Sequence, residues 1–293
     1  MKPAPFDYMA PQTVEEAAAV LQQHRSEARL LAGGQSLMPL LNLRLTQPKI
    51  IIDLNGISSL AGIEESSANL LIGAMTRQSK VECSLAVQRG CPILVEALRQ
   101  VGHVAIRHRG TIGGSLVHAD PAAELPAVAL VLDAKFEVIR NGVKRTIAAA
   151  DFFIDYLTTA VGSDEILQKI IFPVLQPSLG YAVEEITRRH GDFAVAGVAA
   201  VVRLDRAERI DETRIALFGV APTAIRAPAV EATLKGQTPS AVVIREAAAL
   251  LGEMLDPPSD VHASSAYRKH VCRVLATRAL MRAVQRCHER RLS

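Results

Sequence analysis

At 293 residues the chain is long enough for two or three compact domains, and its 49% hydrophobic content supports a substantial core. That core must be aliphatic, because Trp is absent and aromatic residues contribute only 4%. The 33 basic and 30 acidic residues leave a formal net charge of +3, a balance that gives no indication of a nucleic-acid partner.

The sequence also lacks the patterns of membrane and metal proteins. Its first residues carry no hydrophobic signal segment, and no apolar run approaches the ~20 residues of a membrane span. We therefore expect a cytoplasmic protein without a membrane span. The cysteines form no C-x-x-C pair of the kind that holds zinc or an iron–sulfur cluster, so we predict no metal site in this chain. They are Cys83, Cys91, Cys272 and Cys287.

Strands and helices alternate at the start of the chain. The capping box at 13–16 predicts the beginning of a helix. A short buried strand at 30–32 runs into a Gly-Gly turn, and Ser36 is the expected N-cap of the helix that follows. Residues 50–54 form another buried strand. Strand, helix and strand joined by short turns predict a small parallel βαβ unit.

The pattern changes in the middle of the chain. A strand is expected at 69–74, and a helix opened by a proline is expected over 92–102. Asp120-Pro121 is the expected N-cap and first residue of a further helix. Asn141-Gly142, flanked by β-type runs, predicts a hairpin, and a last strand is expected at 165–172.

Leu175-Gln176-Pro177-Ser178 is the best candidate for a domain boundary. β-type runs and then helical stretches follow it, which predicts an α+β domain. The expected strands cover 181–189, 193–204 and 213–220, and the expected helices cover 241–251 and 266–286. The expected divisions are an N-terminal subdomain at 1–55, a central subdomain at 56–174 and a C-terminal domain at 178–288.

Two short glycine turns are the most informative feature. Ala32-Gly33-Gly34-Gln35-Ser36 and Thr111-Ile112-Gly113-Gly114-Ser115 each follow a β-type run and precede an expected helix. Each is expected to present backbone N–H groups unobstructed by a Cβ. Neither is a Walker A loop or a G-x-G-x-x-G fingerprint, and either alone is also compatible with a simple tight connection. Together they indicate two halves of a clamp for the phosphates of a nucleotide cofactor.

The stretches AGGQSL at 32–37 and TIGGSLVHADPAAELPA at 111–127 closely resemble the FAD-binding medium subunits of the molybdenum hydroxylases. These are the relatives of bacterial carbon monoxide dehydrogenase and xanthine dehydrogenase. Further matching stretches lie at 72–76, 191–194 and 267–268, so the resemblance runs nearly end to end. It implies an α+β chain with a PCMH-type FAD-binding fold, made of a small βαβ subdomain plus a mixed α/β subdomain. An antiparallel sheet with helices would follow.

The resemblance also implies a set of FAD-binding residues. The first turn would wrap the pyrophosphate and part of the ribityl chain, and the second would bind from the other side. Glu124 would reach a cofactor hydroxyl, and Asp120 could assist, although we expect Asp120 to cap a helix. Phe193 would lie beside the flavin ring or, equally, in a strand core. The full set is Leu31, Ala32, Gly33, Gly34, Gln35, Ser36, Thr111, Ile112, Gly113, Gly114, Ser115, Asp120, Glu124 and Phe193.

Some positions depart from the family pattern, and for others no functional role is predicted. Ser115 replaces the asparagine that many relatives have, and Gln35 stands where related flavin oxidases bond FAD to a histidine. An amide does not make that bond, so we predict non-covalent FAD.

The histidines of this region are expected to be hydrogen-bonded loop residues, although one near the flavin could tune its potential or move protons. They are His103, His108 and His118. Glu184-Glu185 is expected to be a solvated strand or loop end, and no catalytic residue is expected.

The resemblance implies an electron-transfer flavoprotein subunit. A large molybdopterin subunit would hydroxylate the substrate, and a small subunit with [2Fe–2S] clusters would pass electrons to FAD. The flavin would deliver them to an external acceptor, in an assembly expected to be a dimer of heterotrimers. The alternative is a stand-alone, non-covalent FAD oxidase or reductase with its own small substrate. A third possibility, an interaction subunit that has lost its cofactor, is disfavoured by the intact glycines.

Overall fold

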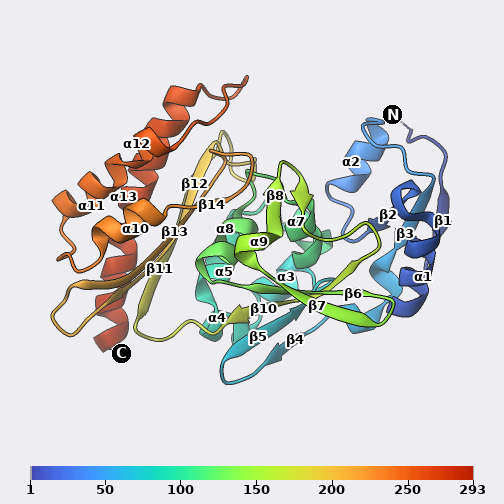
Figure 1. Ribbon diagram of the computed structural model, residues 1–293, viewed down its shortest axis with the longest axis horizontal. Helices are drawn as coiled ribbons and strands as arrows, with labels where there is room; N and C mark the ends of the chain where they lie inside the picture. Colours follow the sequence, from blue (N-terminus) through green and yellow to red (C-terminus); the bar gives the residue numbers. More distant parts are fainter. Residues whose placement is uncertain (1, 293) are drawn as a thin grey trace.

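Three sheets and a short β-hairpin follow one another in the computed structural model, which describes residues 2–292 and the side chains of residues 2–290 (Figure 1). The first sheet lies near the N-terminus, the second in the middle and the third beside the C-terminal helices. This order agrees with the predicted α+β class. None of the helices within residues 2–292 is long and apolar enough to cross a membrane.

The first sheet is parallel throughout, in the order β1-β3-β2. Its strands are β1 (Asp7–Met9), β2 (Ala28–Leu31) and β3 (Ile50–Asp53), and its helices are α1 (Val14–His24) and α2 (Leu37–Asn42). Short 3-10 turns occur at Arg25–Glu27, Leu54–Gly56 and Ser58–Leu60. The predicted parallel βαβ unit is confirmed. Ser36 holds the N-cap position of α2, but its side chain makes no capping hydrogen bond.

The N-terminus of α1 is capped by Thr13, whose Oγ1 accepts a hydrogen bond from the backbone N–H of Glu16 at 3.1 Å. Thr13→Ala is expected to lower the free energy of unfolding by about 1 kcal/mol, because that N–H then loses its partner. Chemical denaturation of the full chain measures the change. Thr233→Ala is the matched control, because the Thr233 hydroxyl donates to the Ala229 carbonyl at 2.9 Å within a helix and caps no N–H group. Equal losses in both variants would contradict the capping role.

The second sheet pairs its neighbouring strands antiparallel, in the order β4-β5-β10-β6-β7. The strands are β4 (Ile63–Glu65), β5 (Asn69–Gly73), β6 (Lys135–Arg140), β7 (Val143–Ala148) and β10 (Ile166–Pro173). Asn141 and Gly142 connect β6 to β7 with φ angles of 49° and 78°, so the predicted hairpin is confirmed.

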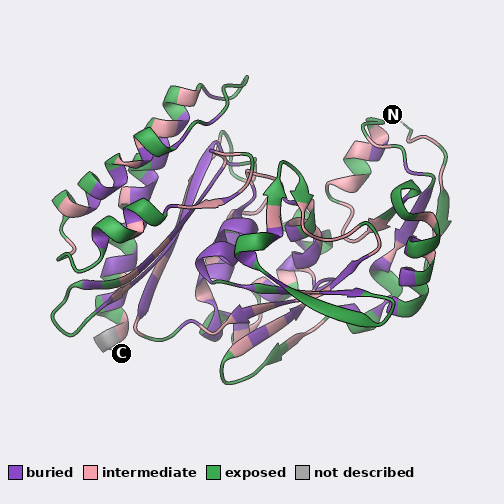
Figure 2. Ribbon diagram, viewed as in Figure 1, coloured by how far each residue is buried: buried purple, intermediate pink, exposed green. Residues whose placement is uncertain are grey.

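Short helices surround this second sheet. They are α3 (Gln78–Glu82), α4 (Leu85–Gly90), α5 (Pro92–Gln100), α6 (Val104–Arg109), α7 (Ile112–His118), α8 (Glu124–Val131) and α9 (Ala149–Phe152). The β-hairpin beside α7 consists of β8 (Phe153–Asp155) and β9 (Thr158–Thr159). Every residue of α8 is buried, because this helix lies between the second sheet and the third (Figure 2).

Two local predictions in this part were wrong. The run before the second glycine turn is the helix α6, where the buried Arg107 donates to Glu82 at 2.8 Å and to the Val101 carbonyl at 3.0 Å. These contacts outweigh the β-propensity of its Val and Ile. Asp120 does not cap a helix, because α8 begins at Glu124. The Asp120 carboxylate instead accepts from the N–H of Ala122 at 2.9 Å, which closes an Asx turn.

The third sheet is antiparallel, in the order β11-β12-β13-β14. Its strands are β11 (Leu179–Ile186), β12 (Ala196–Leu204), β13 (Ile210–Phe218) and β14 (Ile225–Arg226). The helices after it are α10 (Pro228–Leu234), α11 (Ala241–Ala249), α12 (Leu251–Met254) and α13 (Ser265–Leu292). One face of the sheet packs on α13 and the other on α8, so alternate residues of β12 belong to two different cores.

Candidate functional site

The two glycine turns lie directly against each other. A Cβ on Gly33 would come within 2.4 Å of the Arg109 carbonyl oxygen and 2.7 Å of the Gly110 Cα. A Cβ on Gly114 would lie 3.2 Å from the Cβ of Ala32. Such an approach between backbones requires residues without side chains. The structure therefore brings together the two segments that the sequence predicted as halves of one clamp.

A relay of polar side chains joins the two turns. The Asn55 amide donates to the Ala32 carbonyl at 2.9 Å, and the Arg77 guanidinium donates to the Asn55 Oδ1 at 2.6 Å. The other arm of Arg77 donates to the Arg109 carbonyl, just before the second turn. Neither Asn55 nor Arg77 is predicted from the sequence. Asn55 follows β3, and the first turn follows the parallel neighbour β2. Because the carboxyl ends of parallel strands lie side by side, the position of Asn55 in the sequence could have indicated that it lies beside the first turn.

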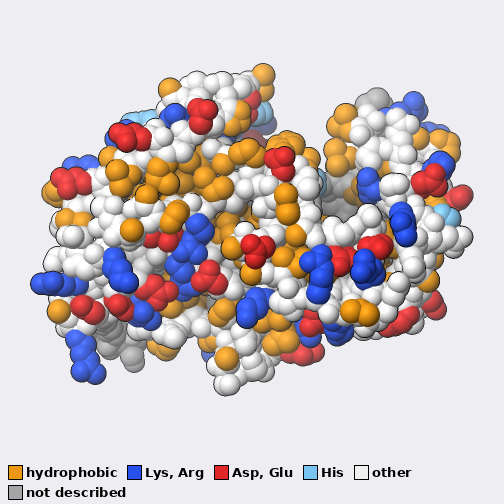
Figure 3. Space-filling model, viewed as in Figure 1, with side chains coloured by type: hydrophobic (Ala, Val, Ile, Leu, Met, Phe, Trp, Pro, Cys, Tyr) orange, Lys and Arg blue, Asp and Glu red, His pale blue; other side chains and the backbone are white. Residues whose placement is uncertain are grey.

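A cavity of about 640 Å³ lies beside the first turn. It is lined by residues of the turn and α2, by the last residue of β3 and a residue just after it, and by two arginines of the central part of the chain: Leu31, Ala32, Gly33, Gly34, Gln35, Met38, Pro39, Asp53, Asn55, Arg77 and Arg109. A hollow separates the segment around α2 from the central part on the face drawn in Figure 3. Residues 31–35 of the predicted site thus share one cavity wall.

The first turn is a ready hydrogen-bond donor. Among the described residues, none accepts from the backbone N–H groups of 34–37, although N–H groups farther along α2 are bonded. The side-chain amide of Gln35 donates to the Gly33 carbonyl at 3.0 Å and so stiffens the turn. Consecutive unbonded N–H groups at a glycine turn form a concave site for an anion. The expectation that this turn presents its N–H groups is confirmed.

The second turn differs, because its N–H groups already have acceptors within the protein. Gly113 N–H donates to the Ala74 carbonyl at 2.8 Å, and Gly114 N–H donates to Thr111 Oγ1 at 3.0 Å. The N–H groups of Ile112 and Ser115 are also bonded to backbone carbonyls. Both glycines lie inside α7 and do not precede it. The prediction that this turn presents free N–H groups was wrong: its glycines permit close packing.

The charge around the cavity is mainly positive. Arg77 and Arg109 line it, and no carboxylate of the described residues lies within ion-pair distance of either. Partial burial and, secondarily, the charge of Arg109 lower the pKa of Arg77. Asp53 is the single carboxylate among the lining residues. Partial burial opposes its ionisation, but hydrogen bonds from the Tyr8 hydroxyl and from Asn55 hold its pKa below the usual value.

Three predicted site residues lie away from this cavity. Asp120 is half-buried in its Asx turn, and Glu124 begins the buried helix α8. Phe193 lies in the loop between β11 and β12 with 65% of its surface exposed. A strand-core role for Phe193 is therefore wrong. The remaining residues, Ser36 and 111–115, follow lining residues closely in the sequence but do not line the cavity themselves.

Glu124 meets another carboxyl group between the second and third sheets. Glu185 lies on the face of β11 that packs toward α8, and its Oε2 is buried with no hydrogen-bond partner in the described residues. Burial, followed by the nearby charge of Glu185, raises the pKa of Glu124 to about 8. Burial raises the pKa of Glu185 to about 7. Glu184 points the other way and pairs with Arg282 at 2.7 Å, so the predicted solvated Glu184-Glu185 end was wrong.

The histidines of this region sit on or beside helices rather than in loops. His103 precedes α6, His108 lies within it, and His118 is in the last turn of α7. Burial lowers the pKa of His118, with Asp120 acting in the opposite direction. Across the described residues, no group of His, Cys, Asp or Glu side chains is arranged to hold a metal ion.

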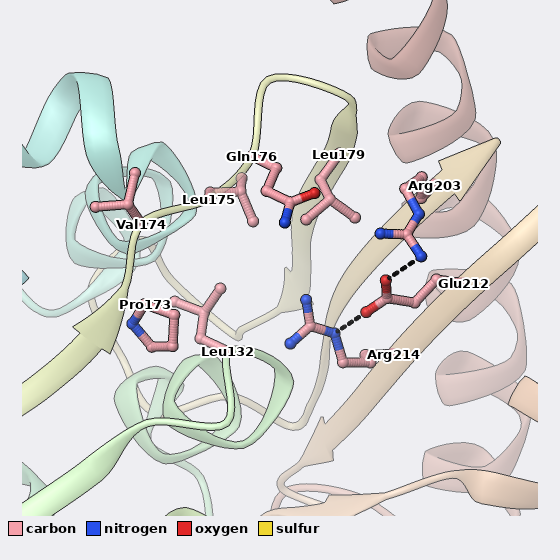
Figure 4. A pocket seen from close by; sticks show the side chains of 9 residues that line it. All are labelled: Leu132, Pro173, Val174, Leu175, Gln176, Leu179, Arg203, Glu212 and Arg214. Carbon is pink, nitrogen blue, oxygen red and sulfur yellow. Dashed lines mark ion pairs between the residues drawn. The ribbon is translucent and has the colours of Figure 1, made fainter. Parts of the chain in front are cut away.

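A smaller cavity of about 130 Å³ lies where the segment after β10 passes the third sheet (Figure 4). Its polar wall is an alternating row in which Glu212 pairs with Arg203 and with Arg214, each at 3.0 Å. Arg214 pairs further with Asp133 at 3.0 Å. Because these charges compensate one another, the row stabilises the third sheet and, through Asp133, its contact with the segment between α8 and β6.

Comparisons with known proteins bear on both parts of the chain. Residues 4–175 match the family model "FAD binding domain in molybdopterin dehydrogenase", and residues 181–283 match "CO dehydrogenase flavoprotein C-terminal domain". The chain is 39% identical to subunit alpha of the 6-hydroxypseudooxynicotine dehydrogenase complex of Paenarthrobacter nicotinovorans, over 98% of this chain and 97% of that protein. It is 36% identical to the medium chain of carbon monoxide dehydrogenase of Hydrogenophaga pseudoflava, over 98% and 100%.

Solved structures give the same result. A structure of carbon monoxide dehydrogenase from Hydrogenophaga pseudoflava superposes with a TM-score of 0.95 at 37% identity, covering 98% of this chain and 100% of the other. Quinoline 2-oxidoreductase from Pseudomonas putida 86 superposes with a TM-score of 0.93 at 34% identity, covering 97% and 99%. The similarity therefore extends over nearly the whole length of these chains.

Proposed function

Because the chain belongs to the family of FAD-binding medium subunits of the molybdenum hydroxylases, we propose that it is the electron-transferring flavoprotein of a multi-subunit dehydrogenase. In this proposal it receives electrons from the [2Fe–2S] clusters of a small partner subunit and passes them to an external acceptor. Substrate hydroxylation takes place on a large molybdopterin subunit. The observation that carries the proposal is the cavity whose walls are the first glycine turn and two arginines that have no carboxylate partner among residues 2–290.

The residues of the cavity fit the charged part of FAD. The N–H groups of 34–37 offer donors to phosphate oxygens, and the close approach of Gly33 to Arg109 and Gly110 shapes the wall. We propose that residues 31–36 hold the diphosphate and that residues 111–115 lie on its other side, where Ser115 offers its hydroxyl while the buried Thr111 shapes the second turn through its bond to the Gly114 N–H. When bound, FAD can take up electrons singly and release them in pairs, and the protein's part is to hold and orient it.

The flavin ring needs an apolar surface next to this cavity. Exposed apolar side chains occur on α6, α7, the β8–β9 hairpin and the loop before β12: Val104, Ile106, Val117, Leu157 and Phe193. These elements are neighbours, since α7 packs on β9 and Gly191 abuts His103. We place the ring among them, with Phe193 beside it. Asp120 and Glu124, at the end of α7 and the start of α8, border this region and would face cofactor hydroxyls.

We propose non-covalent attachment of FAD. Gln35 occupies the position of the flavin-bonding histidine of related oxidases, and its amide is engaged with the Gly33 carbonyl at 3.0 Å. An amide offers no nucleophile for a bond to the ring. We also propose a dimer of heterotrimers, in which the divisions at 1–55, 56–174 and 178–288 form the medium subunit.

Purification of the native complex tests the proposal. We expect it to contain a large and a small partner chain and a flavin absorbance band, and acid precipitation is expected to release FAD into the supernatant. Flavin retained in the precipitated protein would contradict non-covalent attachment. A chain that takes up no FAD on reconstitution would overturn the proposed function. A lone chain that oxidises a small substrate without partners would support the stand-alone oxidase instead.

A further inference from the structure

We propose that Arg77 and Arg109 clamp the diphosphate of the cofactor as a pair of cations, and that Arg77 in addition holds the two glycine turns at their working separation. This inference rests on the proposed function, because it assumes that the cavity beside the first turn receives FAD. It assigns roles to two side chains that lie outside both glycine turns.

The first observation is that these two arginines lack a carboxylate partner among the described residues. Elsewhere in the described chain, arginines that are buried in contacts have carboxylate partners: Arg107 pairs with Glu82 at 2.8 Å, and Arg268 pairs with Asp260 at 2.6 Å. Arg77 is partly buried and Arg109 is exposed; both line a shared cavity, and neither has such a partner among residues 2–290. Two guanidinium groups beside each other repel, so their placement is stabilised when an anion binds between them.

The second observation is the balance of charge within the cavity. Its lining contains two cations, Arg77 and Arg109, and one anion, Asp53. Two positive charges and one negative charge leave a net charge of +1, and Asp53 is already engaged by Tyr8 and Asn55. The diphosphate is the only charged part of FAD at neutral pH, with one negative charge on each phosphate. A wall of unbonded N–H groups at 34–37 completes the complement to such a group.

The third observation is the double use of Arg77. One nitrogen donates to the Asn55 Oδ1 at 2.6 Å, and through the Asn55 amide it reaches the Ala32 carbonyl of the first turn. Another nitrogen donates to the Arg109 carbonyl, and the Arg77 backbone forms an isolated bridge with Thr111. A rigid, planar guanidinium can serve both partners at once, whereas a lysine ammonium is a single point charge. Arg77 is therefore a positioning residue as well as a phosphate ligand.

The test compares binding of FAD and of riboflavin, which has no phosphate, to the full chain after its flavin is removed. Arg109→Met and Arg77→Met are each expected to weaken FAD binding about 10- to 100-fold, the usual range for a charge-assisted hydrogen bond. Riboflavin binding is expected to change less than about threefold in Arg109→Met, because riboflavin carries no phosphate with which the Arg109 charge could pair. The salt dependence of FAD affinity should also become shallower. Arg89→Met, which removes only an exposed pair with Glu65 at 3.5 Å, is the matched control.

The positioning role is tested separately. Arg77→Lys keeps the charge but cannot hold both partners, so it is expected to recover only part of the FAD affinity lost in Arg77→Met. Asn55→Ala should weaken FAD binding, and its effect should not add to that of Arg77→Met, because both break one relay. Full additivity, or full recovery with lysine, would contradict positioning. Equal losses for FAD and riboflavin in Arg109→Met would overturn the clamp, as would wild-type affinity in both methionine variants. Failure of the wild-type chain to bind FAD would refute the proposed function instead.

Discussion

Gly33→Ala is expected to weaken FAD binding by about 100-fold or more, the factor that a loss of about 3 kcal/mol produces. The added Cβ would stand 2.4 Å from the Arg109 carbonyl oxygen and 2.7 Å from the Gly110 Cα. Both are backbone atoms, so no side-chain rotation relieves the overlap, and the two turns must separate. Gly33 has no positive φ, so the effect arises from this contact and not from backbone conformation.

The same substitution is expected to leave the chain folded. The contact joins Gly33 of the first turn to the end of α6 and to Gly110, and none of these residues belongs to the apolar clusters of the core, so the melting temperature should fall by only a few degrees. Fluorescence titration with FAD and thermal unfolding of the same preparation separate the two effects. Gly252→Ala is the control, since its Cβ would make an ordinary contact at 3.4 Å with the Arg273 side chain. Wild-type affinity in Gly33→Ala would show that the turns need not touch for FAD to bind.

Local sequence signals predicted those parts of the fold that depend on local chemistry. The capping box at 13–16 and the Asn141-Gly142 hairpin were right, because a cap and a type I′ turn are decided by neighbouring residues. The helix α6 was missed, since its stability comes from the distant Glu82, which pairs with the buried Arg107. Asp120 has two local options, an N-cap and an Asx turn, and only the position of α8 decides between them.

The candidate site shows the same division. The glycine turns were visible in the sequence, but the contact between them was not, because it depends on how two domains pack. The relay through Asn55 and Arg77 also joins residues that are remote in sequence. One signal was available and unused. Adjacent residues of a strand point to opposite faces, so Glu184 and Glu185 could not both be solvated in a sheet that is covered on both sides.

The buried pair of Glu124 and Glu185 is expected to make the stability of the chain depend on pH. The pKa of Glu124 is raised to about 8 in the folded chain, against 4.5 as the ordinary value, first by burial and then by Glu185 and Asp120. A raised carboxyl pKa means that the folded state binds the proton more tightly than the unfolded state. The corresponding stability is fully present below about 4.5 and is lost as the pH rises to about 8. Glu185, whose pKa is raised to about 7, acts in the same direction.

Glu124→Gln should therefore be more stable than the wild type above pH 8 and nearly equal to it at pH 5. The amide imitates the protonated carboxyl in shape but cannot ionise, so the variant avoids the charge that burial penalises. We expect its melting temperature to exceed that of the wild type by several degrees at pH 9, at about 2–4 °C for each kcal/mol in a chain of this size. Thermal unfolding of the flavin-free chain between pH 5 and 9 measures the difference.

Glu64→Gln is the matched control for this pH dependence, because Glu64 is an exposed glutamate at the start of the second sheet. Its melting temperature should follow that of the wild type at every pH. Glu185→Gln should reproduce part of the effect, and the double variant should show less than the sum, since removing the charge of Glu185 lowers the folded pKa of Glu124. A difference between Glu124→Gln and the wild type that stays constant from pH 5 to 9 would mean that Glu124 does not titrate in this range. The contact between α8 and the third sheet would then be held by packing alone, with no contribution from protonation of Glu124.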